Sequence, residues 1–274
     1  MTITATNTGK VPNTSATAAS TGSDLNGMAA YNAATAIRGR MANIAAEHFD
    51  VPVEEIIFRE GRVHAGNRSI SFGELAKMTW AARVQLSEAG YYATPKIHWD
   101  PATLKGRPFF YFTYGAAVAE VAIDTLTGES RCLRADLLQD CGASLNPAID
   151  LGQIEGAFVQ GMGWLTCEEL WWDDKGRLRT IGPSTYKIPG SRDVPREFNV
   201  ALVGNAPNAE ETVYRSKAVG EPPLMLGVSV WLAICDAIAS CGREGLSPHL
   251  KAPATPENIL HAIDDIRVRS GAME

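Results

Sequence analysis

The spacing of hydrophobic residues changes along the chain, and each change predicts a different secondary structure. Apolar residues recur every three or four positions in several segments, as at Met28 and Tyr31, which is typical of helices with one buried face. Such patterns cover three long segments and a short one: 25–49, 75–86, 154–170 and a last helix that begins at Thr255-Pro256-Glu257. Ser71 and Glu74 have the spacing of a capping box ahead of the second helix. Three glycines in the third helix predict a close approach of another backbone segment.

Short apolar runs on either side of turn residues predict β-hairpins. Glu60-Gly61 lies in the middle of one hairpin at 56–64, and Thr127-Gly128-Glu129 lies in a longer one at 110–138. A further strand is expected at 198–203. Because hairpins and long helices follow one another without a regular strand-helix-strand repeat, the sequence predicts an α+β fold, with mixed sheets and hairpins packed with long helices.

One carboxylate near the end of the chain is placed unusually. Glu221 lies between Gly220 and the pair Pro222-Pro223, directly ahead of the apolar run 224–234. A residue before proline avoids helical geometry and proline suits the first turn of a helix. We therefore expect Glu221 just outside the N-terminus of a helix that is buried on nearly every face. Such a carboxylate is either a general base or a simple helix cap, and the local sequence favours the cap.

Between Val11 and Asp24 the side chains are mostly small, being largely those of Pro, Asn, Thr, Ser, Ala and Gly. A loop of this composition that opens a helix presents backbone N–H groups and hydroxyls, with which proteins hold phosphate-like anions. Ordinary helix caps and disordered leaders have a similar composition. The segment alone therefore leaves all three interpretations open.

The composition excludes several classes of function. The chain has 274 residues, 45% of them hydrophobic, and a net charge of −6, so it offers no basic surface for nucleic acid. Its five cysteines are scattered and odd in number, which argues against a disulfide framework and favours a cytoplasmic location. The N-terminus does not resemble a signal peptide, and we expect no apolar run to span a bilayer. Neither a membrane nor nucleic acid is an expected partner.

The usual sequence signals of metal and nucleotide sites are missing. The five histidines are isolated, without HxH or HExxH spacing, and no cysteines have CxxC spacing. The motifs GxSxG, GxxxxGKS/T and GxGxxG are also missing. We therefore expect no metal held by protein side chains, and an organic cofactor remains as the carrier of any difficult chemistry.

Motifs along nearly the whole chain resemble, in order, those of the xanthine dehydrogenase and aldehyde oxidase family. They are the segments 11–24, 140–142, 145–157, 166–170, 182–189 and 220–224. Within that family, 184–189 and the Glu-Pro-Pro-Leu sequence look closer to xanthine dehydrogenases. The resemblance implies the fold of the second molybdopterin-binding domain of xanthine dehydrogenase over residues 1–274, as a fragment or a split subunit, with a sub-boundary near 90–110.

The resemblance also implies roles for particular residues. Glu221 is implied as the base that takes a proton from a hydroxyl on molybdenum, whose oxygen then attacks a purine carbon, converting hypoxanthine to xanthine and xanthine to urate. Ala18 and Ala19 are implied as the wall on which the flat substrate packs. The molybdenum-molybdopterin cofactor is implied to contact residues of three segments: Ala19, Ser20, Thr21, Gly22, Ser23, Gln153 and Gly220.

Each implied role has a structural alternative, in which the alanines are filler, the hydroxyls are caps and Gln153 is a core amide. Three further acids are expected to be structural or solvated: Glu155, Glu168 and Glu169. Three tryptophans are expected in the core or at an interface and not as a stacking platform: Trp164, Trp171 and Trp172.

The 2Fe-2S and FAD groups of the family are expected on missing domains or partner subunits, so the resemblance implies a chain that is inactive by itself. Two alternatives to a purine hydroxylase stay open. One is a non-catalytic module for cofactor binding or subunit assembly, and the other is a hydroxylase of an aldehyde or another N-heterocycle.

Overall fold

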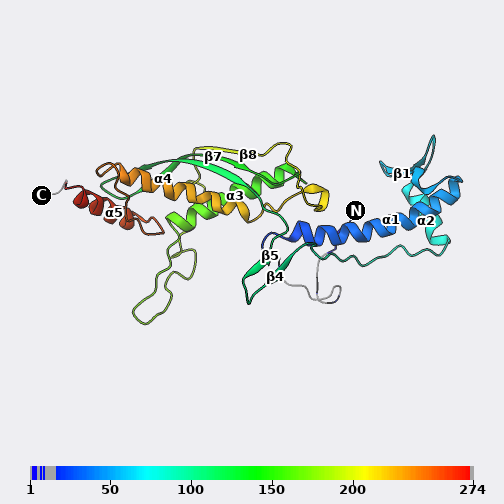
Figure 1. Ribbon diagram of the computed structural model, residues 1–274, viewed down its shortest axis with the longest axis horizontal. Helices are drawn as coiled ribbons and strands as arrows, with labels where there is room; N and C mark the ends of the chain where they lie inside the picture. Colours follow the sequence, from blue (N-terminus) through cyan, green and yellow to red (C-terminus); the bar gives the residue numbers. More distant parts are fainter. Residues whose placement is uncertain (1, 5–6, 8, 10–16, 272–274) are drawn as a thin grey trace. The chain divides into compact units, whose positions relative to one another are not determined.

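The structure is a computed structural model that describes residues 2–4, 7, 9 and 17–271. The first part of the small-residue stretch, residues 11–16, lies outside the described residues. The chain forms two compact units, Met1–Phe110 and Tyr111–Glu274 (Figure 1).

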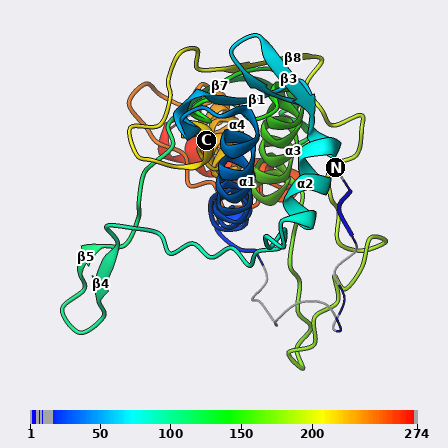
Figure 2. The same ribbon diagram turned by 90° about the vertical axis from the view of Figure 1, so that its right-hand side faces the viewer.

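The first unit is a long helix with a small sheet and a short helix packed around its C-terminal half. Its elements are η1 (Gly22–Asn26, a π-helical turn), α1 (Gly27–Phe49), η2 (Val53–Glu55), β1 (Ile56–Arg59), β2 (Arg62–Ala65), β3 (Arg68–Ser71), α2 (Phe72–Ala81), β4 (His98–Asp100) and β5 (Lys105–Arg107). Strands β1, β2 and β3 pair antiparallel in sequence order. Strands β4 and β5 form a separate hairpin, which Figure 2 shows as its own projecting ribbon.

The turn between β1 and β2 has the geometry that its sequence requires. Glu60 and Gly61 both have positive φ, at 51° and 71°, as the two-residue turns of hairpins do. The hairpin predicted at 56–64 is therefore confirmed. Strand β3, which continues the sheet after a second tight turn at Gly66, and the β4–β5 hairpin were not predicted from the sequence pattern.

The start of α2 is set by a reciprocal capping box. The hydroxyl of Ser71 accepts the N–H of Glu74, and the carboxylate of Glu74 accepts the N–H of Ser71, as the spacing predicted. The helix ends at Ala81, earlier than the expected range 75–86. Arg83 adopts a left-handed φ of 61°, which the helical pattern of its neighbours does not reveal.

The core of the first unit lies between the C-terminal half of α1, the sheet and α2. Its buried residues are Met41, Ala42, Ala45, Phe49, Ile56, Val63, Ala65 and Leu75. Along the other half of α1 runs the connection that follows α2. A Cβ on Gly90 would lie 1.9 Å from the carbonyl oxygen of Ala29, and Arg40 forms an ion pair with Glu88 at 2.8 Å. These contacts hold the connection against the helix.

The second unit is a three-stranded sheet with α3 and α4 on one face (Figures 1 and 2). Its elements are β6 (Gly115–Ile123), β7 (Ser130–Gln139), α3 (Pro147–Thr166), β8 (Glu197–Leu202), η3 (Val213–Arg215), η4 (Pro222–Gly227), α4 (Val228–Ala239) and α5 (Pro256–Arg269). Strand β6 pairs antiparallel with β7, and β8 pairs parallel with β7. The hairpin at 110–138, the strand near 198 and the last helix are confirmed, and so is the α+β class.

Alternation along β6 places one row of side chains against the helices. Ala117, Ala119, Val121 and Ile123 pack on the core, whereas the residues between them are exposed. The parallel pairing of β7 with β8 requires a crossover, which α3 provides. One strand-helix-strand unit therefore exists inside an otherwise mixed fold.

Helix α3 begins seven residues before the predicted start at residue 154. The side chain of Asn146 accepts the N–H of Ile149, and Pro147 occupies the first turn, so Asn146 and Pro147 are the sequence signal that sets the true start of the helix. The predicted close approach at a glycine is confirmed, since a Cβ on Gly161 would lie 2.1 Å from the carbonyl oxygen of Leu224 in η4. Helix α3 and the η4–α4 segment run in the same direction (Figure 1).

The η4–α4 segment is buried on one side only. Val230, Ile234 and Ile238 face α3 and the sheet, whereas Met225 and Leu232 are 65% and 55% exposed. The expectation of a helix buried on nearly every face is wrong, because the sheet and α3 cover only one side of it. By length and composition alone Pro222–Ala239, with a mean hydropathy of 1.7, could cross a membrane, which corrects the expectation that no apolar run could. An interior helix meets the same criterion.

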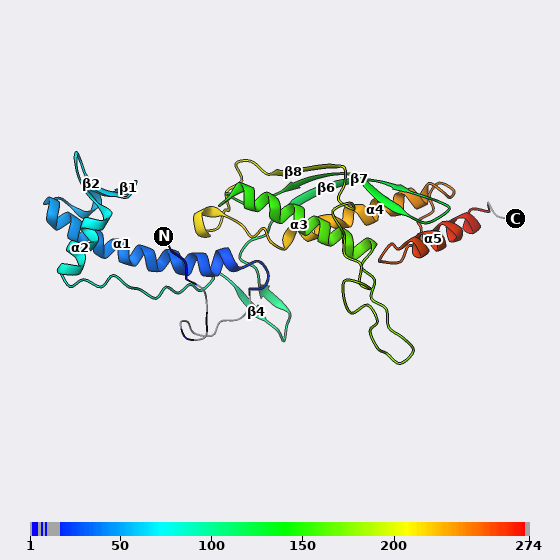
Figure 3. The same ribbon diagram turned by 180° about the vertical axis from the view of Figure 1, so that it is seen from behind.

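The connection from α3 to β8 is a long loop that extends away from the sheet (Figure 3). It contains a turn around Asp173, whose carboxylate accepts the N–H groups of Lys175 and Arg177. Trp171 and Trp172 in this loop are more than half exposed, as is Trp164 at the end of α3. The core alternative for these three tryptophans is therefore wrong.

Candidate functional site

The residues with implied roles fall into two groups, one in each unit. Residues 18–21 form the loop before η1 in the first unit, and Gly22 and Ser23 are the first residues of η1. Gln153, Gly220 and Glu221 belong to unit two, on α3 and at the start of η4.

At the start of η1 the N-cap residue does not cap the helix with its side chain. The backbone N–H and the hydroxyl of Thr21 both donate to the carbonyl oxygen of Ala18, at 3.3 and 3.0 Å. Thr21 is the N-cap residue of η1, yet its side chain makes no capping hydrogen bond. Since N–H groups in a first helical turn lack partners inside the helix, those of Gly22 and Ser23 can serve a ligand.

The same loop contains two residues in a sparsely populated backbone conformation. Ala19 and Ser20 have φ of 53° and 54°, in the left-handed region that residues with a Cβ rarely adopt. Each such residue costs on the order of 1 kcal/mol, and strain of this kind gathers in loops that bind ligands. Ala18 and Ala19 are exposed. Small side chains, hydroxyls and the backbone N–H groups of a helix start together fit a phosphate-bearing pterin.

Glu221 lies where the sequence predicted, immediately before the helix. It is the N-cap residue of η4, with φ −103° and ψ −37°, and Pro222-Pro223 form the first turn. Its carbonyl oxygen accepts the N–H of Leu224 at 3.0 Å. The side chain is exposed and makes no capping hydrogen bond, so the helix-cap interpretation is not supported.

Gln153 lies on a face of α3 that the second unit leaves open. It is exposed, and so are Gly152 and Gly156 beside it, where an added Cβ would meet no atom within 4 Å. The alternative of a core amide is therefore wrong. Because α3 and η4 run in the same direction and Gly161 contacts Leu224, Gln153 and Glu221 lie toward the same end of this helix pair.

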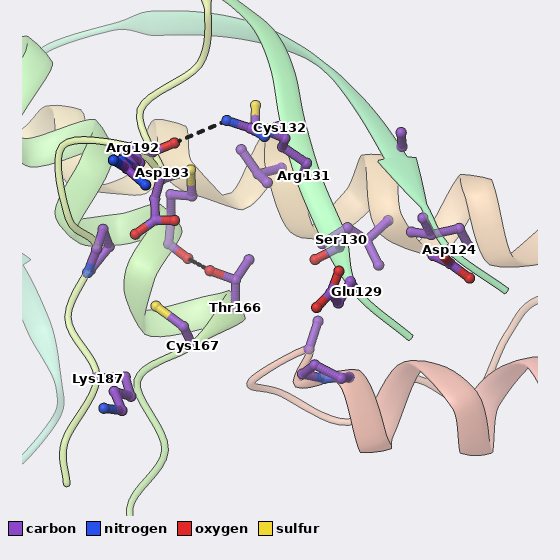
Figure 4. Close-up of a pocket in the computed structure, with 18 of the residues that line it drawn as sticks. Asp124, Glu129, Ser130, Arg131, Cys132, Thr166, Cys167, Lys187, Arg192 and Asp193 are labelled. Carbon is purple, nitrogen blue, oxygen red and sulfur yellow. Dashed lines mark hydrogen bonds between the residues drawn. The ribbon is translucent and has the colours of Figure 1, made fainter. Parts of the chain in front are cut away.

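A wide cavity lies toward the other end of the helix pair and contains none of the implied site residues. Its volume is about 1030 Å³, and its walls come from the ends of β6 and β7, from α3, α4 and the long loop (Figure 4). Arg131 reaches across it to the carbonyl oxygen of Arg192 at 3.3 Å. Burial raises the pKa of Cys132 to about 11, so this thiol stays protonated at neutral pH. Burial also raises the pKa of Cys167.

Two of the family-like motifs contact each other through a pair that sequence reasoning missed. The hydroxyl of Tyr186 donates to the carboxylate of the buried Glu168 at 2.6 Å, and this hydrogen bond raises the pKa of Tyr186. The structural role expected for Glu168 is confirmed. Their sequence separation of 18 residues gives no local signal by which to find the pair.

Within the part of the chain that the structure describes, no group of three or more His, Cys, Asp or Glu side chains is arranged to hold a metal ion.

Comparison with known proteins gives a consistent set of relatives. The family of molybdopterin cofactor-binding domains matches residues 1–195. Xanthine dehydrogenase of Dictyostelium discoideum is 47% identical over 263 residues, which cover 94% of this chain and 18% of the relative. Xanthine dehydrogenase/oxidase of Gallus gallus is 45% identical over 266 residues, which cover 96% of this chain and 18% of the relative.

Two solved structures have a similar fold. Quinoline 2-oxidoreductase from Pseudomonas putida 86 gives a TM-score of 0.73 at 25% identity and covers 91% of this chain and 31% of its own. CO dehydrogenase from Oligotropha carboxidovorans gives a TM-score of 0.74 at 22% identity. The match covers 96% of this chain and 31% of that protein's chain. The resemblance inferred from the motifs is confirmed: the chain belongs to the family of molybdopterin cofactor-binding domains and is similar to part of the xanthine dehydrogenases.

Proposed function

We propose that the chain is the C-terminal cofactor-binding part of a xanthine-dehydrogenase-type hydroxylase and carries its catalytic base. The observation that carries this proposal is Glu221, a carboxylate fixed before a helix without a capping role, toward the same end of a helix pair as Gln153. Identities of 44–47% to xanthine dehydrogenases favour a purine over an aldehyde as substrate.

The reaction sets what the protein has to do. Hydroxylation of a purine carbon replaces a C–H bond by a C–O bond with oxygen from water, and it releases two electrons and two protons. When bound, the molybdenum-molybdopterin cofactor supplies the metal centre that accepts the electrons. The side chains have to orient the purine, hold the pterin and take up protons. Repeating the reaction at a second carbon converts hypoxanthine to xanthine and then to urate.

Glu221 acts as the general base. Its carboxylate takes the proton from the water-derived oxygen as that oxygen attacks the purine carbon. Gly220, which has no side chain, leaves room beside this carboxylate. A base of this kind contributes roughly 100- to 10,000-fold to the rate.

The other site residues bind and orient. Ser20, Thr21, Gly22 and Ser23, together with the backbone of Ala19, hold the pterin and its phosphate by hydroxyls and N–H groups. Ala18 and Ala19 present a flat wall to the purine. Gln153 donates a hydrogen bond to the cofactor from the open face of α3.

The electrons leave through 2Fe-2S and FAD groups on remaining domains or partner subunits in the cytoplasm. The chain spans 18% of the length of the first xanthine dehydrogenases that it matches. We expect the isolated chain to turn over nothing, since part of a pocket cannot orient a substrate.

The test is the substitution Glu221→Gln in the complete molybdenum-loaded assembly. Steady-state oxidation of xanthine per bound molybdenum is expected to fall by at least about 100-fold, because the amide cannot accept the proton. The matched control is Glu155→Gln, an exposed glutamate on α3, which is expected to leave the rate unchanged. Equal rates for the two variants would overturn the assignment.

The same assay separates the alternatives. Cofactor binding without oxidation of purine, aldehyde or N-heterocycle by the wild-type assembly would favour a non-catalytic module. Oxidation of quinoline or an aldehyde in preference to xanthine, lost on Glu221→Gln, would keep the base and change the substrate.

A further inference from the structure

The residues just before Glu221 are tied to the end of β7 by backbone hydrogen bonds. The N–H of Lys217 donates to the carbonyl oxygen of Cys141 at 2.8 Å, and the N–H of Ala143 donates to that of Arg215 at 2.9 Å. The chain that leads into the catalytic carboxylate is therefore joined to the central strand of the sheet.

The segment after β7 and the segment before Glu221 approach each other closely, through a glycine and several buried polar groups. Gly142 forms an antiparallel bridge with Ser216, and its φ is +66°. A Cβ on Gly142 would lie 2.5 Å from the carbonyl oxygen of Arg215, so this approach requires glycine. The carbonyl oxygen of Ser216 accepts the hydroxyl of Thr212 at 2.6 Å and the amide of Asn208 at 3.2 Å, and all three residues are buried.

A buried ion pair connects the same two segments through side chains. Nζ of Lys217 lies 2.5 Å from Oδ2 of Asp140, and the two side chains are only 11% and 8% exposed. Oδ1 of Asp140 accepts the N–H of Gly142 at 2.8 Å, and the ammonium group lies 5.4 Å from the ring centroid of Tyr114. Removal of either partner would leave a buried charge uncompensated, so the pair constrains where both segments lie.

One more side chain holds the segment from the start of the second unit. The hydroxyl oxygen of Tyr111 accepts the N–H of Ala218 at 2.8 Å. Ala218 is three positions before Glu221. Only Val219 and Gly220 therefore lie between the anchored amide of Ala218 and Glu221.

We propose that Asp140, Lys217 and Tyr111 are positioning residues for Glu221, an inference that rests on the function proposed above for this carboxylate. They fix the strand from which Glu221 projects, and they do so through groups that do not touch the reacting atoms. A displacement of a catalytic group by about 1 Å costs on the order of 100-fold in rate. Loss of the ion pair therefore lowers turnover and leaves the binding loop in the first unit unaltered.

The test uses Lys217→Met and Lys217→Arg in the complete molybdenum-loaded assembly. Lys217→Met is expected to lower kcat per bound molybdenum by about 10- to 100-fold, with KM for xanthine within about twofold of wild type. Lys217→Arg, which keeps the charge, is expected to recover kcat to within about threefold. Because the partners act as a unit, Asp140→Asn combined with Lys217→Met is expected to be no worse than Lys217→Met alone.

The matched control is Arg269→Met, which breaks an ion pair with Asp265 on α5 in the same unit, at 2.8 Å. It is expected to leave kcat unchanged. A common loss of kcat in both methionine variants would mean that lost ion pairs act only through stability. Unchanged kcat in Lys217→Met, alongside an inactive Glu221→Gln, would overturn the positioning role while leaving the proposed function intact. An active Glu221→Gln would overturn the proposed function itself.

Discussion

The two groups of candidate site residues, one in each unit, both lie at the start of a helix, yet they are built in opposite ways. The loop before η1 has small side chains, hydroxyls, two residues at positive φ and no side-chain cap from Thr21. The segment before η4 presents one carboxylate, followed by two prolines and anchored through Lys217 and Ala218. The first arrangement offers backbone groups to a ligand, whereas the second fixes one side chain. Our proposal therefore gives the same element, a helix start, a binding role in one unit and a catalytic role in the other.

The largest change in stability is expected where η4 packs on α3, the contact that supports the segment of Glu221. In Gly161→Ala the added Cβ would lie 2.1 Å from the carbonyl oxygen of Leu224, so the two helices have to separate. We expect the free energy of unfolding to fall by about 3 kcal/mol. Chemical denaturation of the chain measures it.

The control for that change lies on the same helix. In Gly156→Ala the added Cβ would meet no atom within 4 Å, and the change replaces a glycine inside a helix by a better helix former. It is expected to raise the free energy of unfolding by about 0.5–1 kcal/mol. A Gly161→Ala protein as stable as Gly156→Ala would contradict the close packing that supports η4.

A smaller effect is expected at the binding loop. Thr21→Ala removes a hydroxyl that is proposed to bind the cofactor, and one hydrogen bond to a charged group contributes about 1.5 kcal/mol, so cofactor affinity should fall about tenfold. Molybdenum retained by the complete assembly after gel filtration measures this. Thr35→Ala, an exposed threonine further along α1, serves as the control. Equal retention in both variants would show that the loop hydroxyl does not bind the cofactor.

The smallest effect is expected at the hydrogen bond between Tyr186 and Glu168, within the long loop that follows α3. The hydrogen bond to Glu168 raises the pKa of Tyr186 above its ordinary value of 10.0, so the folded state favours the protonated phenol. The resulting stability is fully present below pH 10 and is lost as pH rises through the raised pKa. Tyr186→Phe should cost about 1 kcal/mol at neutral pH.

Thermal unfolding between pH 7 and 11 tests this dependence. The wild-type and Tyr186→Phe proteins should differ at neutral pH and converge at the alkaline end. A difference that stays constant up to pH 11 would rule out the Tyr186–Glu168 bond as its cause.

Local chemistry made much of the fold predictable. The turn at Glu60-Gly61 and the capping box of Ser71 and Glu74 are each encoded within four residues, and the structure has both. The start of α3 is also encoded locally, by Asn146 and Pro147. The apolar pattern that follows predicted a later start, at residue 154. A predicted helix start is misplaced when it is taken from the apolar pattern and not from the capping residues.

The connections that hold the site could not be predicted, because they join residues far apart in sequence. Lys217 and Asp140 are 77 positions apart, and Tyr111 and Ala218 are 107 apart. No periodicity or spacing in one sequence pairs such residues. The position of Glu221 before a helix was local and therefore accessible, whereas its anchoring to β7 required the folded chain.

The most direct test of the central claim is a single turnover under anaerobic conditions. Xanthine is mixed with the complete assembly carrying Glu221→Gln, at a molybdenum content matched to wild type, and reduction of the bound cofactor is followed by absorbance. If Glu221 is the base, xanthine still binds and the reduction slows by at least about 100-fold. Reduction at the wild-type rate would mean that the proton goes elsewhere, and Glu221 would have no catalytic role.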